Sequence, residues 1–206
     1  MEYNQNYENY KIARDRAWKI LIRYNVNSLP VDVFNICKKS GVLIYDYIDG
    51  YDLISRLGLE RYTKYDGFTV RLENRYIIFY NNFVTPFGRI RFTLAHEIGH
   101  IALKHLKKDA AALNKGGETP PNNPEMQANI FAARLLAPAC VLHEIGVKSA
   151  EQLQSATKIS LTAAKIRFDR LQELRKRNAF YKNPYEIEVY KNFKPYINEY
   201  KLINNL

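Results

Sequence analysis

The sequence predicts a mainly helical α+β fold in which a small antiparallel sheet lies beside one buried helix. Apolar residues recur at the spacing of amphipathic helices over most of the chain. β-branched and aromatic residues concentrate instead in two neighbouring runs, 67–72 and 75–80, as expected for paired strands. Residues 90–108 are apolar around most of a helical circumference, so we expect that helix to be buried.

The first half of the chain is predicted to alternate short helices with strands. Pro30 suits the first position of a helix because its φ is fixed, and Gly41 suits the end of that helix. Glu73 and Asn74 separate the two strand-like runs and predict the tight turn of a hairpin. The expected elements, in order, are a frayed terminus at 1–8, helices at about 10–24 and 30–41, a strand at 42–47, a helix at 51–57, the hairpin at 67–80 and a loop at 81–88.

The second half is predicted to be helical after one long break. Residues 114–123 combine Gly and Pro pairs that prevent regular structure, and such a loop is either a lid over a site or a plain surface connection. Asn123 and Pro124 then suit the N-cap and first position of a helix that stops at Pro138. The remaining expected elements are helices at 139–145, at 149–157 with a capping box of Ser149 and Gln152, and at 161–177 behind Ser160, then an irregular or weakly helical tail from 178.

These elements group into three predicted parts. Residues 1–145 form the main domain, residues 146–178 form a segment like a helix-turn-helix that packs on the core, and residues 179–206 form an aromatic and basic tail of unassigned role. The net charge is +10, and residues 158–206 carry eleven Lys and Arg against five Asp and Glu. A basic surface attracts nucleic acid or an acidic protein, or is simply a solvated helical face.

The sequence lacks the marks of export and of membrane insertion. No apolar run approaches the roughly 18 residues of a membrane span, and the N-terminus lacks the basic and then apolar pattern of a secretory signal. Cys37 and Cys140 lie far apart without a Cys-x-x-Cys spacing, so we expect both to be small buried residues. We therefore expect a cytoplasmic protein.

The helix predicted to be buried contains the motif His-Glu-x-x-His at His96, Glu97 and His100. Residues four apart lie on one helix face, so both imidazoles can bind one Zn²⁺ ion. Glu97 lies about 100° around the helix from His96, where its carboxylate can accept a proton from an attacking water. The alternative is a helix whose histidines are solvated or pack in the core, but a buried helix leaves such polar groups in need of partners.

A catalytic zinc site needs a third protein ligand from outside this pair. His105 lies on the opposite side of the helix unless the helix ends first, and His143 is a further candidate. Glu125 opens the helix after the long loop, with Asn129 one turn later, although an acidic residue in a first turn also suits the helix dipole. Gly99 weakens the motif helix, which predicts the close approach of another backbone, such as a strand along a cleft.

Several segments together resemble the ImmA/IrrE family of zinc metallopeptidases. The resemblance covers about residues 10–175 and rests on RFTLAHEIGHIALKH at 91–105, EMQANIFAARLLAP at 125–138, PVDVF at 30–34, DGFT at 66–69 and YIIFYN at 76–81. It implies a zincin-like fold with His96, His100 and Glu125 as Zn²⁺ ligands and Glu97 as the catalytic acid and base. Ala137 departs from the family, which commonly has Met at that position.

The activity that this resemblance implies is that of a zinc metalloendopeptidase. Its substrate would be a specific intracellular protein, a DNA-binding helix-turn-helix repressor, whose cleavage relieves repression. A Tyr or His143 would stabilise the oxyanion, and the sequence selects neither. Two other functions stay open: a non-proteolytic, zinc-containing regulator that binds DNA or a transcription regulator, as the pattern at 149–175 suggests, and a peptidase of broad specificity.

Overall fold

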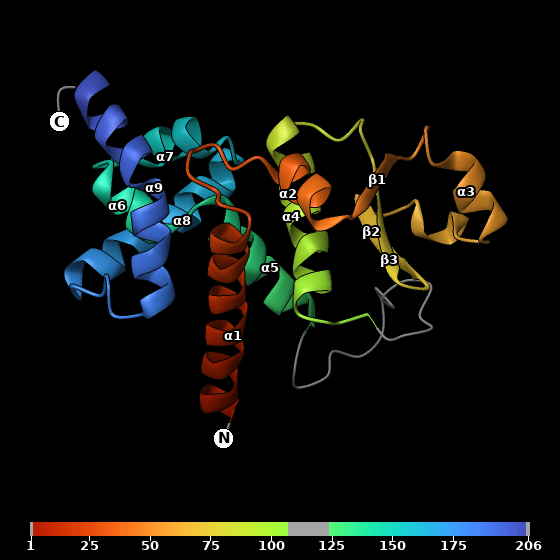
Figure 1. The fold of residues 1–206 in the computed structure, drawn as a ribbon, viewed down its shortest axis with the longest axis horizontal. Helices are drawn as coiled ribbons and strands as arrows, with labels where there is room; N and C mark the ends of the chain where they lie inside the picture. The colour runs from red at the N-terminus through yellow and green to blue at the C-terminus, as the bar shows by residue number, and fades with distance from the viewer. Residues whose placement is uncertain (1, 107–123, 205–206) are drawn as a thin grey trace. The chain divides into compact units, whose positions relative to one another are not determined.

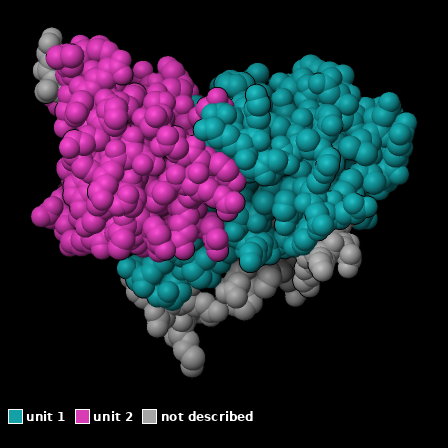
Figure 2. Space-filling view, viewed as in Figure 1, with its two compact units in different colours: residues 1–13, 33–132 teal, residues 14–32, 133–206 magenta. Residues whose placement is uncertain are grey.

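The computed structural model describes residues 2–106 and 124–204. This part of the chain is mainly helical and contains one small sheet, so the predicted α+β class is confirmed (Figure 1). The chain divides into two compact units, residues 1–13 with 33–132 and residues 14–32 with 133–206 (Figure 2). The predicted loop at 114–123 lies outside the described residues.

The first unit contains a sheet of β1 (Leu43–Asp46), β2 (Gly67–Leu72) and β3 (Arg75–Tyr80), and its strand order is β1-β3-β2. Strands β2 and β3 pair antiparallel around a turn that begins at Glu73, so the predicted hairpin is confirmed. Strand β1 runs parallel to β3, which makes the sheet mixed rather than wholly antiparallel. The elements described in this unit, in order, are the start of α1 (Glu2–Arg23), α2 (Val33–Ser40), β1 (Leu43–Asp46), α3 (Tyr51–Arg56), η1 (Glu60–Tyr62), β2 (Gly67–Leu72), β3 (Arg75–Tyr80), α4 (Phe87–Ala102) and most of α5 (Pro124–Leu136).

One face of the sheet closes an apolar core with α3 and η1. Alternate side chains of a strand point to opposite faces, so Phe68 and Val70 of β2 join Ile77 and Phe79 of β3 in this core. The rings of Phe68 and Phe79 stack with their centroids 5.1 Å apart. The opposite face, which includes Thr69, packs against α4 (Figure 1). The motif helix is therefore held against the sheet.

Helix α4 also packs against α5, and Gly99 sets how closely the two helices approach. A Cβ at Gly99 would lie 3.0 Å from the Phe131 ring and 3.3 Å from the Cα of Ala128. The predicted close approach of a backbone to Gly99 is confirmed, but the neighbour is helix α5 and not a strand. A residue without a side chain is needed here because α5 must come near the motif helix.

Replacing Gly99 with Ala is expected to destabilise the fold. The substitution gains about 1 kcal/mol of helix propensity, whereas overpacking against Phe131 and Ala128 costs about 1–3 kcal/mol. We expect a net loss of up to about 2 kcal/mol in the free energy of unfolding, measured by urea denaturation. If Gly99→Ala were more stable than the wild type by about 1 kcal/mol, α5 would accommodate the added methyl group without an energetic cost.

The second unit is helical in its described part. The hydroxyls of Ser149 and Ser160 accept hydrogen bonds from the backbone N–H groups of Gln152 and Ala163, so both predicted N-caps are confirmed. Lys158, at φ 56°, ends the first of these two helices. The described elements are the rest of α1, the end of α5, α6 (Ala139–Glu144), α7 (Ala150–Thr157), α8 (Leu161–Lys176) and α9 (Pro184–Ile203).

The prediction of an irregular or weakly helical tail is wrong, because α9 spans Pro184–Ile203. Val189, Phe193 and Ile197 are buried at helical spacing along it. This apolar stripe outweighs the backbone hydrogen bond that Pro195 removes inside the helix. Tertiary packing therefore decides the structure of this segment, against the local signal of its prolines.

Two predicted helix starts also differ from the structure. Helix α1 begins at Glu2, so the prediction of a frayed terminus is wrong over residues 2–8. Helix α2 begins at Val33, so Pro30 precedes the helix instead of opening it. The bodies of both helices lie where the sequence predicts them.

Two other features bear on the predicted class of protein. None of the helices within residues 2–106 and 124–204 combines the length and the apolar character that a bilayer span requires. Cys37 and Cys140 are both buried, as predicted.

Candidate metal centre

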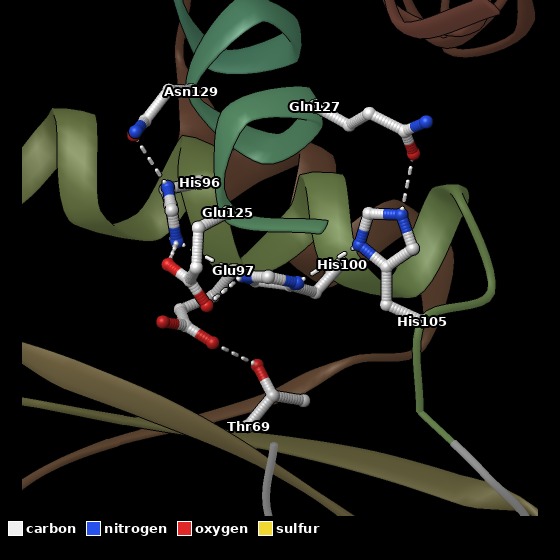
Figure 3. A network of polar contacts seen from close by, with 8 residues as sticks. All are labelled: Thr69, His96, Glu97, His100, His105, Glu125, Gln127 and Asn129. Atoms are coloured by element: carbon white, nitrogen blue, oxygen red, sulfur yellow. Dashed lines mark hydrogen bonds and ion pairs between the residues drawn. The ribbon is translucent and has the colours of Figure 1, made fainter. Parts of the chain in front are cut away.

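The two motif histidines lie on the buried side of α4 with their rings converging. His96 and His100 are one helical turn apart, and their Nε2 atoms are 2.9 Å from each other. His100 is completely buried and His96 nearly so. The predicted pair of imidazoles on one helix face is therefore present (Figure 3).

Glu125, in the first turn of α5, brings a carboxylate to the same point. One of its oxygens lies 3.1 Å from His96 Nε2 and the other lies 3.4 Å from His100 Nε2. Within the described residues, these three side chains form a group that could hold a metal ion. Tetrahedral bonds of about 2.0–2.2 Å place neighbouring donor atoms roughly 3.3 Å apart, so the spacing suits zinc.

The partners behind the two rings direct nitrogen atoms toward Glu125. His96 Nδ1 lies 2.9 Å from the carbonyl oxygen of the Asn129 side chain, which only accepts hydrogen bonds. Nδ1 of His96 therefore donates, and in the tautomer with its proton on Nδ1 the lone pair is on Nε2. His105 takes the corresponding place behind His100, with the two Nδ1 atoms 3.0 Å apart. Lone pairs and a carboxylate converging in this way need a cation or shared protons between them, so the donor set fits the zinc ion that the resemblance implies.

The charge of Glu125 complements this arrangement. Hydrogen bonding to His100 and His96 holds the pKa of the Glu125 carboxyl well below its usual value, although desolvation opposes the shift. Glu125 is therefore ionised at neutral pH. The Glu125 side chain keeps 43% of its exposure, whereas His100 is completely buried, so the centre is partly exposed only on the side of Glu125.

Glu97 lies beside the donor atoms, on the side of the sheet. It is 1% exposed, and one carboxylate oxygen accepts a hydrogen bond of 2.7 Å from the hydroxyl of Thr69 on β2. Figure 3 shows this carboxylate next to Glu125, with Thr69 beneath it. Thr69 thereby orients Glu97. Sequence reasoning assigned no role to Thr69, although this residue lies in the DGFT segment that contributes to the resemblance.

The other histidines and the tyrosines named as alternatives take different places. His143 belongs to the second unit, where its ring stacks on Phe180 with centroids 4.1 Å apart and accepts a hydrogen bond from Arg175. The metal-binding group within the described residues therefore contains Glu125 and not His143. The hydroxyl of Tyr47 donates to the carbonyl of Tyr65, and burial together with the charge of Glu97 raises the pKa of Tyr47, which keeps that hydroxyl protonated.

Comparison with known proteins identifies the family. A family model described as the IrrE N-terminal-like domain, Peptidase_M78, matches residues 51–169, more than half of the chain. The matched segment includes α4, α5 and the three converging side chains. No curated protein matches the chain. The resemblance drawn from the sequence is confirmed, and the chain belongs to the Peptidase_M78 family of IrrE N-terminal-like domains.

Proposed function

We propose that the protein is a zinc-dependent endopeptidase that cleaves one intracellular protein, a helix-turn-helix transcriptional repressor, and so relieves repression. The observation that carries the proposal is the convergence of His96, His100 and Glu125, with the buried Glu97 carboxylate beside them. Membership of a peptidase family supports hydrolysis of a peptide bond. The repressor as substrate rests on the resemblance to ImmA/IrrE proteins, and a repressor substrate would require the protein to act in the cytoplasm.

The residues of the site divide the chemistry among them. His96, His100 and Glu125 would hold the ion through two imidazole nitrogens and a carboxylate oxygen. When bound, zinc supplies a Lewis acid that lowers the pKa of water to about 7 and polarises the scissile carbonyl. Glu97 accepts the proton of the attacking water and later transfers it to the leaving amine. Thr69 keeps Glu97 oriented for both transfers.

Replacing Thr69 with Val is expected to slow cleavage without removing zinc. Val has nearly the same shape but cannot donate to Glu97, and a hydrogen bond to a charged group is worth about 1.5–3 kcal/mol. We expect kcat to fall about tenfold or more, with zinc content at the wild-type level by mass spectrometry. Thr69→Ser is the matched control, because it retains the hydroxyl. Equal loss in the Ser and Val variants would assign the effect to packing.

DNA binding is the alternative function. Helices α7 and α8 pack together after the left-handed Lys158, as in a helix-turn-helix. However, Arg167 of α8 is buried and donates to the carbonyl of Ala137, and Arg170 pairs with Glu173. Arg167 is therefore withdrawn from the predicted basic surface, and the charge of the exposed Arg170 is offset by Glu173. A gel-shift titration distinguishes the two functions, because retention of one specific duplex in moderate salt would favour DNA binding.

Co-expression with a helix-turn-helix repressor encoded beside the chain's own gene tests the proposal. We expect two repressor fragments by mass spectrometry. The purified proteins should give the same fragments, lose them after a chelator is added and regain them with zinc. Casein is the specificity control, because its digestion would indicate a broad peptidase. Intact repressor in the presence of zinc-loaded protein would contradict the proposal.

A further inference from the structure

The end of α4 brings a third histidine back to the candidate metal centre. Lys104 adopts a φ of 60°, and the N–H groups of Lys104 and His105 donate to the carbonyls of Ile101 and His100. This left-handed cap reverses the chain after the helix. His105 therefore returns to His100 instead of lying on the opposite side of α4, and the two rings meet edge to face with centroids 5.1 Å apart.

Behind His105, hydrogen bonds continue through two side-chain amides. His105 Nε2 lies 2.9 Å from the carbonyl oxygen of Gln127 on α5, as Figure 3 shows. The NH₂ group of Gln127 then donates to the side-chain oxygen of Asn9 on α1 at 2.8 Å. Gln127 is 8% exposed and Asn9 is 4% exposed. Buried amides need hydrogen-bond partners, so this chain of contacts is part of the packing of the first unit.

The direction of each hydrogen bond in this series follows from the last one, between Gln127 and Asn9. Because Gln127 gives its NH₂ group to Asn9, its carbonyl oxygen faces His105 and can only accept. His105 Nε2 therefore carries a proton. With its proton on Nε2, the neutral tautomer of His105 has its lone pair on Nδ1, which lies 3.0 Å from His100 Nδ1 and accepts in that contact. His100 Nδ1 must then donate to it, which leaves the lone pair of His100 on Nε2, facing Glu125.

We infer that His105, Gln127 and Asn9 form a positioning relay that holds His100 in its metal-binding tautomer and so sets the zinc affinity of the centre. The inference rests on the proposed zinc site and extends it to α1, more than 110 residues away from Gln127 along the chain. None of the three residues belongs to the donor set itself. Loss of a partner behind a metal-binding histidine typically weakens metal binding by about 10–100-fold.

Zinc affinity, measured by competition with a chromophoric chelator, tests the relay in the full-length protein. His105→Phe keeps a ring against His100 but offers no acceptor, and Gln127→Met leaves His105 Nε2 without one. Each is expected to weaken zinc binding by about 10–100-fold. His105→Asn, which returns an acceptor near the position of Nδ1, is expected to recover most of the affinity.

The two losses should not add, because both act through the same ring. The double variant His105→Phe with Gln127→Met is expected to have the same zinc affinity as the single variant that binds zinc more weakly. Wild-type affinity in either single variant would overturn the relay. Losses that add in full in the double variant would also overturn it.

A loss of packing alone predicts a different pattern. Val70 lies in the apolar core of the sheet in the same unit, and Val70→Ala is expected to lower the melting temperature at unchanged zinc affinity. At the same melting temperature, the relay variants should bind zinc more weakly than Val70→Ala does. If Val70→Ala loses zinc equally at a matched melting temperature, the relay is overturned.

The tautomer of His105 gives a readout independent of metal and of activity. The ¹⁵N shifts of its ring should report a proton on Nε2 in the wild type and a mixture of tautomers in Gln127→Met. If the wild type bound no zinc but the His105 tautomer still changed in Gln127→Met, this result would contradict the proposed function and support the relay. Zinc binding with an unchanged tautomer and affinity in Gln127→Met would overturn the relay and leave the proposed function standing.

Discussion

Replacing Glu97 with Gln is expected to abolish cleavage while zinc remains bound in near-stoichiometric amount. The amide has the shape of the carboxylate but cannot accept the proton of the attacking water. General acid and base catalysis contributes about 10²–10⁴-fold to a rate, and Glu97 is proposed to serve in both roles. The buried position and the contact with Thr69 suit an amide as well as a carboxylate, so the fold should persist.

Cleavage rate and zinc content must be measured on the same sample of the Glu97→Gln variant. Mass spectrometry under native conditions gives the zinc content, and the fragment yield from the repressor gives the rate. Glu188→Gln is a matched control, because it removes one carboxylate from an exposed ion pair with Lys191. Cleavage by Glu97→Gln at the wild-type rate would remove Glu97 from the mechanism.

Replacing Glu125 with Ala is expected to empty the metal site. The variant keeps two imidazoles but lacks the carboxylate that both of them face. We expect zinc affinity to fall by more than the ~100-fold that loss of an outer partner such as Asn129 causes, and cleavage to fall with it.

The position of Glu125 makes this result simple to interpret. Its side chain is 43% exposed, so its removal leaves no buried cavity and should not unfold α5. Circular dichroism at the wild-type level, together with lost zinc, would therefore separate ligation from folding. A metal content equal to that of the wild type would exclude Glu125 from the donor set.

The parts of the fold that the sequence predicts correctly are those with local signals. The hairpin has two β-rich runs around Glu73 and Asn74, and the motif helix has an apolar stripe around its histidines. The position of α5 also follows from Pro124 and Pro138. Each of these signals lies within a few residues of the structure that it predicts, so one sequence suffices to read it.

The contacts that complete the centre could not be predicted in this way. Thr69 meets Glu97 across 28 positions of the chain, and Gln127 meets Asn9 across 118. The return of His105 depends on Lys104 in a left-handed conformation, which glycine or asparagine would have indicated and lysine does not. Gly99 did signal a close approach, but its neighbour is identified only by the packing of α5.

The division of the donor atoms between α4 and α5 gives the ion a mechanical consequence as well as a chemical one. His100 and Glu125 lie 25 positions apart in the sequence, so an ion bound to both would link α4 to α5 as a covalent cross-link would. Such a link opposes opening of either helix end, because a site that is absent from the unfolded chain adds its metal-binding free energy to the stability of the folded state. Zinc should therefore slow amide hydrogen exchange in the first turn of α5, even in protein that never meets a substrate.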